Sequence, residues 1–132
     1  MKIALASDLH LEFSDIDLIN EEGADVLVLS GDIVIARDLH DHPEPEVPYP
    51  PSIIKTLGSR QRNAQLYRDF FKRCSFQFPH VIYIAGNHEF YHGKFLGSLQ
   101  DLRNECGKFP NVYFLEDNCK KINDVTFVGG TL

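Results

Sequence analysis

The sequence contains no tryptophan, a single methionine and only three cysteines. Cys74, Cys106 and Cys119 are odd in number and form no Cys-x-x-Cys pair, so they indicate neither a disulfide framework nor a zinc knuckle. No apolar run is long enough to cross a bilayer, which argues against a membrane partner. The first apolar run stops at Ser7 without a signal-peptide cleavage site. Together these absences predict a cytoplasmic protein with reduced thiols.

Basic residues are also scarce, because 13 lysines and arginines face 19 aspartates and glutamates, giving a net charge of −6. This balance argues against the broad basic surface that non-specific nucleic-acid binding needs. Nucleic acid is therefore not favoured as a partner, although a nucleic-acid ester stays open as a substrate. What the chain does contain is a hydrophobic fraction of 43%, typical of a folded globular protein. Its length predicts a single domain over residues 1–132.

Short, nearly continuous apolar runs predict the strands of a parallel sheet. The runs KIALAS, DVLVLS and HVIYIA each end in a polar turn, and they occupy residues 2–7, 25–30 and 80–85. Runs of this kind suit strands that are buried on both faces, as in a sheet packed between helices. Two further strands are expected at residues 112–115 and 125–128.

Between the strands, apolar residues recur at the spacing of amphipathic helices. The first set is Leu66, Phe70 and Cys74, with Tyr67 and Phe71 beside them. The second set, which stops before Gly107, is Leu96, Leu99, Leu102 and Cys106. Strands that alternate with helices predict an α/β sandwich built from right-handed βαβ units.

Residues 41–51 (DHPEPEVPYPP) break this pattern with five prolines and interleaved acidic residues. Such a composition predicts an extended, solvated surface loop. Because the loop leaves from the Gly31-Asp32 turn, a flap over the neighbouring strand ends is the alternative interpretation.

Candidate metal ligands and one candidate catalytic histidine, His88, follow three of the predicted strands. Asp8 and His10 come after the first strand, Asp32 after the second, and Asn87 and His88 after the third. The carboxyl ends of parallel strands converge on one edge of a sheet, where ligands bind. We therefore expect these side chains to share one crevice, with Gly31 and Gly86 forming the tight turns that admit them.

These residue types suit a pair of divalent cations. Asp8 and His10 are two apart, so in an extended chain both side chains would leave the same face and chelate one ion. The Asp32 carboxylate can bridge two ions, and Asn87 offers a neutral oxygen to the second. Mixed oxygen and nitrogen donors favour Mn, Fe, Zn or Ni. Two ions about 3.5–4 Å apart could activate a water for displacement at phosphorus, with His88 as general acid.

The strings Ser7-Asp8-Leu9-His10, Gly31-Asp32 and Gly86-Asn87-His88-Glu89 resemble, in order, the first signature motifs of the calcineurin-like metallophosphoesterases. The longer strings SDLHLEF, DVLVLSGDI and YIAGNHEFYHG are similar to a bacterial and phage branch of that family. The resemblance implies a calcineurin-like α/β sandwich and metal-dependent hydrolysis of a phosphomonoester or phosphodiester. It also implies roles for five residues: one metal on Asp8 and His10, a bridging Asp32, a second metal on Asn87, and a catalytic His88.

The sequence departs from the family pattern in two places. Ile33 and Val34 follow Asp32 where serine/threonine protein phosphatases have a further aspartate and a DRG segment, which argues against that branch. The family also places metal-binding histidines in later motifs, whereas this chain has no histidine after His92. We therefore expect the first half of a family domain, truncated after it. Either self-association or a partner chain would complete it, or the chain is a catalytically impaired binding module.

A remote alternative lies in the same stretch, because His88-Glu89-Phe90-Tyr91-His92 matches the zinc-protease pattern H-E-x-x-H. That pattern requires a helix, whereas here it follows a strand and a glycine turn, so a loop or short turn is expected. Glu89 is interpreted as a structural hydrogen-bonding partner, and His40, His42 and His80 as ordinary solvated or satisfied histidines.

Overall fold

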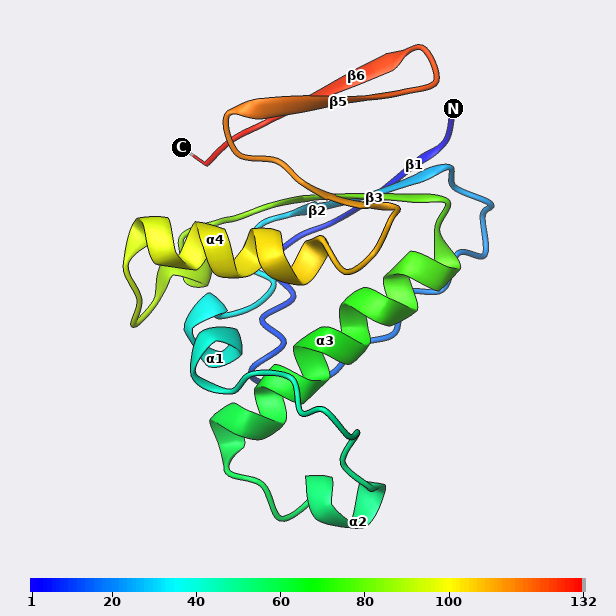
Figure 1. Ribbon diagram of the computed structural model, residues 1–132. Helices are drawn as coiled ribbons and strands as arrows, with labels where there is room; N and C mark the ends of the chain where they lie inside the picture. Colours follow the sequence, from blue (N-terminus) through cyan, green and yellow to red (C-terminus); the bar gives the residue numbers. More distant parts are fainter. Residues whose placement is uncertain (132) are drawn as a thin grey trace.

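The computed structural model describes residues 1–131 and is built around a parallel four-stranded sheet in the order β1-β2-β3-β4 (Figure 1). The strands are β1 (Ile3–Ala6), β2 (Val26–Ser30), β3 (His80–Ile84) and β4 (Val112–Phe114). All three pairings are parallel, with Val26 opposite both Ile3 and His80. The predicted strands are thus confirmed within about two residues at their ends.

Helices cover one face of this sheet (Figure 1). These are α1 (Ala36–Asp41), α3 (Ser59–Gln77), the 3-10 turn η1 (His88–Phe90) and α4 (Phe95–Cys106), whereas the short α2 (Pro51–Ile54) lies apart from the sheet. Because each right-handed crossover advances the chain by one strand in the same direction, the connecting helices fall on the same side. The helices expected around residues 66–74 and 96–106 are confirmed as α3 and α4.

The predicted α/β fold with a parallel sheet and helices is confirmed, but the opposite face of the sheet carries a hairpin where helices were also expected. Its strands β5 (Asn118–Ile122) and β6 (Val125–Gly129) pair antiparallel and lie across the sheet (Figure 1). The strand expected at 125–128 is therefore present, but it belongs to a separate two-stranded sheet. β5 was not predicted, because its sequence NCKKI is mostly polar and exposed.

Two apolar clusters hold these layers together. The larger lies between the helices and the sheet and includes the fully buried Tyr67, Phe71 and Tyr83. The smaller lies between the sheet and the hairpin and consists of Val26, Ile82, Leu115 and Ile122. On α4 the predicted face is only partly right, since Leu99, Leu102 and Cys106 are buried whereas Leu96 is 77% exposed.

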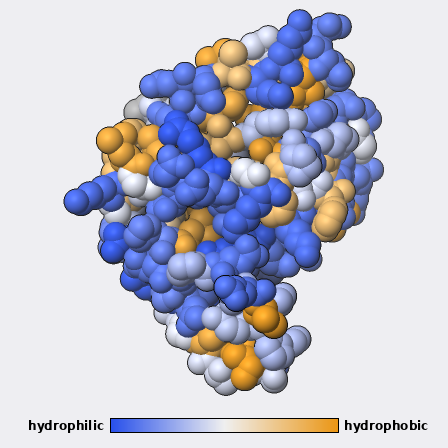
Figure 2. All heavy atoms as spheres, viewed as in Figure 1, coloured by the Kyte–Doolittle hydropathy of each residue, from blue (hydrophilic) through white to orange (hydrophobic). Residues whose placement is uncertain are grey.

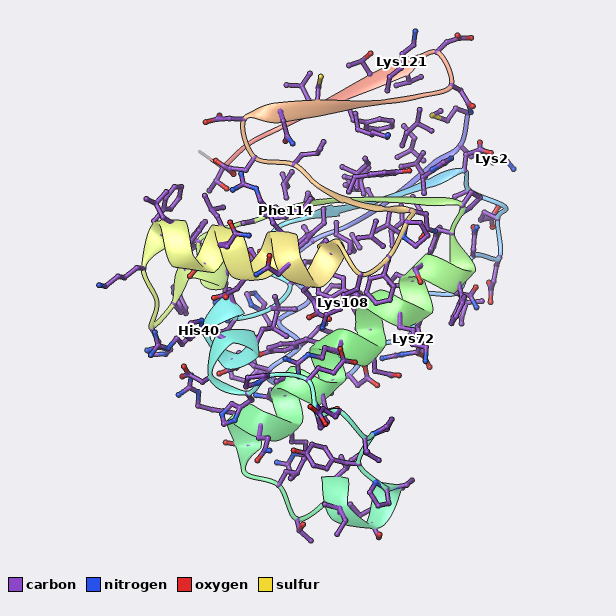
Figure 3. The ribbon with its side chains drawn as sticks, in the orientation of Figure 1. Lys2, His40, Lys72, Lys108, Phe114 and Lys121 are labelled. Carbon is purple, nitrogen blue, oxygen red and sulfur yellow. The ribbon has the colours of Figure 1, made fainter. Side chains whose placement is uncertain are left out.

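The proline-rich segment begins within α1 and ends at the start of α2, and residues 42–50 between them form neither helix nor strand. Its contacts lie along α3 and the end of α4: the Arg68 guanidinium donates to the His42 carbonyl, and Lys108 Nζ lies 2.8 Å from a Glu44 carboxylate oxygen (Figure 3). These contacts hold the segment beside α3 and the end of α4. The segment leads to α2, which projects from the body (Figure 1), and hydrophobic residues are exposed at this end of the molecule (Figure 2).

Within residues 1–131, none of the helices combines the length and apolar character needed to cross a membrane.

Candidate metal centre

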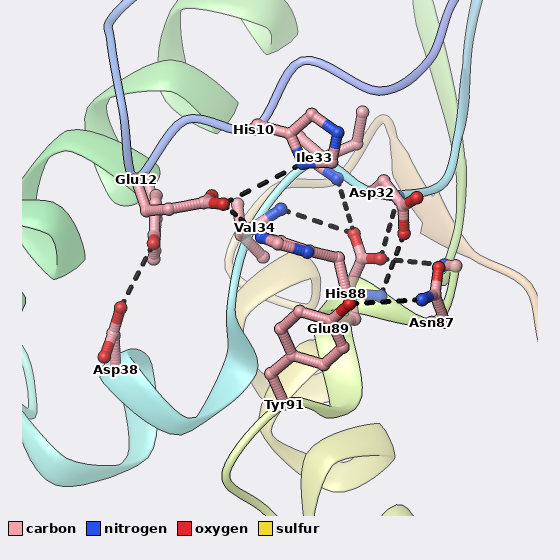
Figure 4. Close-up of polar contacts among 12 residues, drawn as sticks. His10, Glu12, Asp32, Ile33, Val34, Asp38, Asn87, His88, Glu89 and Tyr91 are labelled. Atoms are coloured by element: carbon pink, nitrogen blue, oxygen red, sulfur yellow. Dashed lines mark hydrogen bonds and ion pairs between the residues drawn. The ribbon is translucent and has the colours of Figure 1, made fainter.

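The predicted ligands lie on the loops that follow β1, β2 and β3 (Figure 4). One ligand atom from each of Asp8, His10 and Asp32 lies within 4.8 Å of the others. Asn87 and His88 approach the same carboxylate from the third loop, and the backbone N–H of His88 donates to Asp32 Oδ1 at 2.9 Å. The structure therefore brings all five predicted side chains to one place.

Three of the predicted ligands share an uncommon backbone conformation. Asp8, His10 and Asp32 have φ of 55°, 46° and 56°, in the left-handed region that non-glycine residues seldom adopt. Each such residue costs on the order of 1–3 kcal/mol and persists only where the surroundings enforce it. Asp8 and His10 therefore converge on a tightly curved loop, and the expectation that they extend from one face of a straight strand is wrong.

Backbone hydrogen bonds between the loops enforce these conformations. The Asp8 N–H donates to the Gly31 carbonyl at 3.0 Å, and the His10 N–H donates to the Asp32 carbonyl at 3.1 Å. The Ser7 hydroxyl also donates to Asp8 Oδ2 at 2.7 Å, which orients that carboxylate. The loop after β1 is thus clamped on the loop after β2.

Gly31 and Gly86 let two loops approach more closely than side chains would allow. Gly31 has φ of 93°, and a Cβ on it would lie 2.9 Å from the backbone of Gly86. A Cβ on Gly86 would lie 2.4 Å from Asp32 Oδ1, well inside van der Waals contact. The tight turn predicted at Gly31 is confirmed, whereas Gly86 is needed for space, since its φ is not positive.

The Glu89 side chain joins the same two loops through hydrogen bonds (Figure 4). Its side chain is fully buried, and its carboxylate accepts five hydrogen bonds from the backbone N–H groups of Asp32, Ile33, Val34 and Gly86 and from the Tyr83 hydroxyl. Burial and the neighbouring carboxylate raise the pKa of Tyr83 well above its ordinary value, so the phenol remains a donor. The predicted structural role of Glu89 is confirmed.

The H-E-x-x-H pattern does not form a protease helix. His88–Phe90 is a single 3-10 turn, Tyr91 after it is extended, and His92 is left-handed with φ of 62°. His88 and His92 therefore do not share the face of an α-helix, which zinc ligation by this motif requires. Glu89, the base of that motif, is occupied by its five donors.

Two neighbours of His88 were missed by sequence reasoning. Glu12 lies with its carboxylate in contact with His88 Nε2 and 3.8 Å from His10 Nδ1. The Tyr91 ring packs 4.4 Å from the His88 ring, and its hydroxyl lies 3.4 Å from the Asn87 amide nitrogen. Glu12 is part of the string SDLHLEF, but its approach to His88 depends on the curved loop, which periodicity cannot reveal.

Comparison with known proteins identifies the family. The sequence profile of the calcineurin-like phosphoesterases matches residues 1–131. The chain belongs to this family. Among curated proteins, this phosphoesterase is similar to "Uncharacterized protein L509" of Acanthamoeba polyphaga mimivirus, with 29% identity over 132 residues. The alignment covers 96% of this chain and 42% of the viral protein, so the chain spans less than half the length of that relative. No solved structure gives a significant match.

Membership of the calcineurin-like phosphoesterase family implies divalent metal ions, and the residues present fit them. Asp8, His10 and Asp32 each place a ligand atom within 4.8 Å of the other two. A terminal atom of the Asn87 amide lies 3.1 and 3.2 Å from the two Asp32 carboxylate oxygens, so the amide reaches the same group. Such a cluster of oxygen acceptors beside an imidazole has the donor set of a transition-metal site.

Proposed function

We propose that this protein hydrolyses a phosphate monoester or diester and that it uses two divalent transition-metal ions held by Asp8, His10, Asp32 and Asn87. The observation that carries the proposal is the group formed by Asp8, His10 and Asp32, whose ligand atoms lie within 4.8 Å of one another in a chain matched throughout by the phosphoesterase family. When bound, such ions neutralise charge on the ester and supply hydroxide near neutral pH.

The chain's own residues would divide the remaining work. Asp32 lies between Asn87 and the Asp8–His10 pair, which suits it to bridge two ions. His88 would protonate the leaving oxygen through the ring nitrogen that does not contact Glu12. The Tyr91 ring packs against the His88 imidazole and limits its motion. The backbone clamp and Glu89 would keep these groups in place before any substrate arrives.

A binding module without turnover is the second candidate, and the observation that favours it is the ligand set of the second ion. The Asn87 side of the site has few ligands of its own, since Asn87 is neutral and shares Asp32 with the Asp8–His10 pair. An ion there would be bound more weakly than the ion at Asp8 and His10.

The test is hydrolysis of bis(p-nitrophenyl) phosphate and p-nitrophenyl phosphate by metal-free protein supplied in turn with Mn²⁺, Fe²⁺, Zn²⁺ and Ni²⁺. Metal-dependent turnover by the wild type and its loss in Asp32→Asn are expected. Asp124→Asn is the matched control, because Asp124 is exposed in the turn between β5 and β6. Turnover that survives Asp32→Asn, or a folded wild type that binds metal without turnover, would refute the enzymatic proposal.

A further inference from the structure

The Glu12 carboxylate lies beside two imidazoles, those of His10 and His88, which come from different loops. Glu12 Oε1 contacts His88 Nε2 and lies 3.8 Å from His10 Nδ1, and the two rings meet edge to face with centroids 4.6 Å apart (Figure 4). The Glu12 side chain is only 7% exposed. A buried carboxylate is costly unless it is paired, so this placement calls for an explanation.

The partners of Glu12 are histidines. Among residues 1–131, its ion pairs are those with His10 and His88, and neither lysine nor arginine supplies a further one. Glu12 Oε2 and His10 Nδ1 are both buried without a hydrogen-bond partner. The Glu12 carboxylate is the acidic group beside this nitrogen, with Oε1 at 3.8 Å from His10 Nδ1.

We propose that Glu12 is a positioning residue that orients His10 toward a bound cation and His88 toward the leaving group. A carboxylate beside Nδ1 keeps the proton on that nitrogen and leaves Nε2 of His10 free to bind metal. The direct contact with His88 Nε2 fixes the second ring. The inference rests on the proposed function for its His88 part, whereas its His10 part concerns metal binding alone.

Glu12 also belongs to a group of two imidazoles and one carboxylate, with His10 and His88, whose ligand atoms lie within 4.8 Å of one another. A metal ligand and a positioning residue differ in one measurable respect. Replacing a ligand removes a bound ion, whereas replacing a residue that orients a ligand weakens binding and leaves the number of ions unchanged.

The test compares Glu12→Gln with the wild type and with Glu46→Gln, a matched change at an exposed glutamate in the proline-rich segment. Calorimetric titration of metal-free protein with Mn²⁺ gives affinity and stoichiometry. Loss of an outer partner of a metal-bound histidine costs about 10–100-fold in affinity. We expect a loss of this size in Glu12→Gln with unchanged stoichiometry, and no loss in Glu46→Gln.

A second measurement concerns His88. The kcat for phenyl esters should fall further in Glu12→Gln than the kcat for p-nitrophenyl esters, because the more basic leaving group depends more on protonation. A general structural defect would lower both alike. If Glu12→Gln fails to fold, Glu12→Asp keeps the charge, withdraws the carboxylate by one methylene and carries the same comparison.

The two measurements test the His10 part and the His88 part of the proposal separately. Unchanged Mn²⁺ affinity in Glu12→Gln overturns the orientation of His10, and equal losses for both esters overturn the orientation of His88. Loss of one whole ion would make Glu12 a ligand and overturn the positioning role. If the wild type binds Mn²⁺ without turnover, the proposed function and the His88 part both fall, while the affinity comparison still decides the role of His10.

Discussion

Replacing Glu89 by glutamine should destabilise the protein severely although the side chain keeps its size. The buried carboxylate accepts two hydrogen bonds at Oε1, from Gly86 N at 2.8 Å and Asp32 N at 2.9 Å, and three at Oε2. A glutamine has one acceptor oxygen, so its amide nitrogen must face at least two N–H donors. Hydrogen bonds to a charged group contribute about 1.5–3 kcal/mol each, so we expect a loss of about 3–6 kcal/mol.

Urea unfolding followed by far-ultraviolet circular dichroism measures this loss as a change in the free energy of unfolding. Such a loss is a large part of the roughly 5–15 kcal/mol typical of a domain, so Glu89→Ala, which removes all five bonds, should not fold. Glu46→Gln is the control and should change stability by less than about 0.5 kcal/mol. A Glu89→Gln variant as stable as the wild type would refute the view that this carboxylate fastens the loops.

Three further results are expected. Gly86→Ala should lower Mn²⁺ affinity at least tenfold by calorimetry and cost about 1–3 kcal/mol, because the new Cβ would meet Asp32 Oδ1 at 2.4 Å. Gly97→Ala, whose Cβ meets nothing within 4 Å, should do neither. Mn²⁺ at one hundred times its Kd should increase the free energy of unfolding by about 2.7 kcal/mol and so raise the melting temperature. A melting temperature that Mn²⁺ leaves unchanged would count against an occupied site. Burial raises the pKa of the Cys74 thiol from 9.0 to about 12, so the unfolded state loses this proton first and stability should fall as pH rises above 9. A urea midpoint that stays level from pH 9 upward would contradict that burial.

The sheet and its ligand-bearing edge could be predicted because they depend on local signals. In the run DVLVLS the four residues 26–29 are apolar without interruption, and the run ends where β2 ends, at Ser30. The helix of residues 95–106 stops at Gly107 as expected. Since carboxyl ends of parallel strands share an edge, the strands alone placed Asp8, Asp32 and Asn87 together.

The remainder depends on tertiary contacts that leave no periodic signal. The left-handed conformations of Asp8 and His10 are imposed by hydrogen bonds from the neighbouring loop, which sequence spacing does not encode. The polar strand β5 forms because Ile122 packs in the smaller apolar cluster and the strand pairs with β6. Glu12 was not singled out from the sequence, because the burial of its side chain follows from the curvature of the loop that carries it.

The five-donor cradle of Glu89 bears on how the centre acquires its metal. Because the protein's own carboxylate holds the loops after β2 and β3, the ligands are gathered before an ion arrives. Metal binding should therefore proceed without rearrangement of the site, with little heat-capacity change and no slow kinetic phase. A chelator should then strip the ion without unfolding the chain, and a single preparation could be reloaded with Mn²⁺, Zn²⁺ or Ni²⁺ in succession.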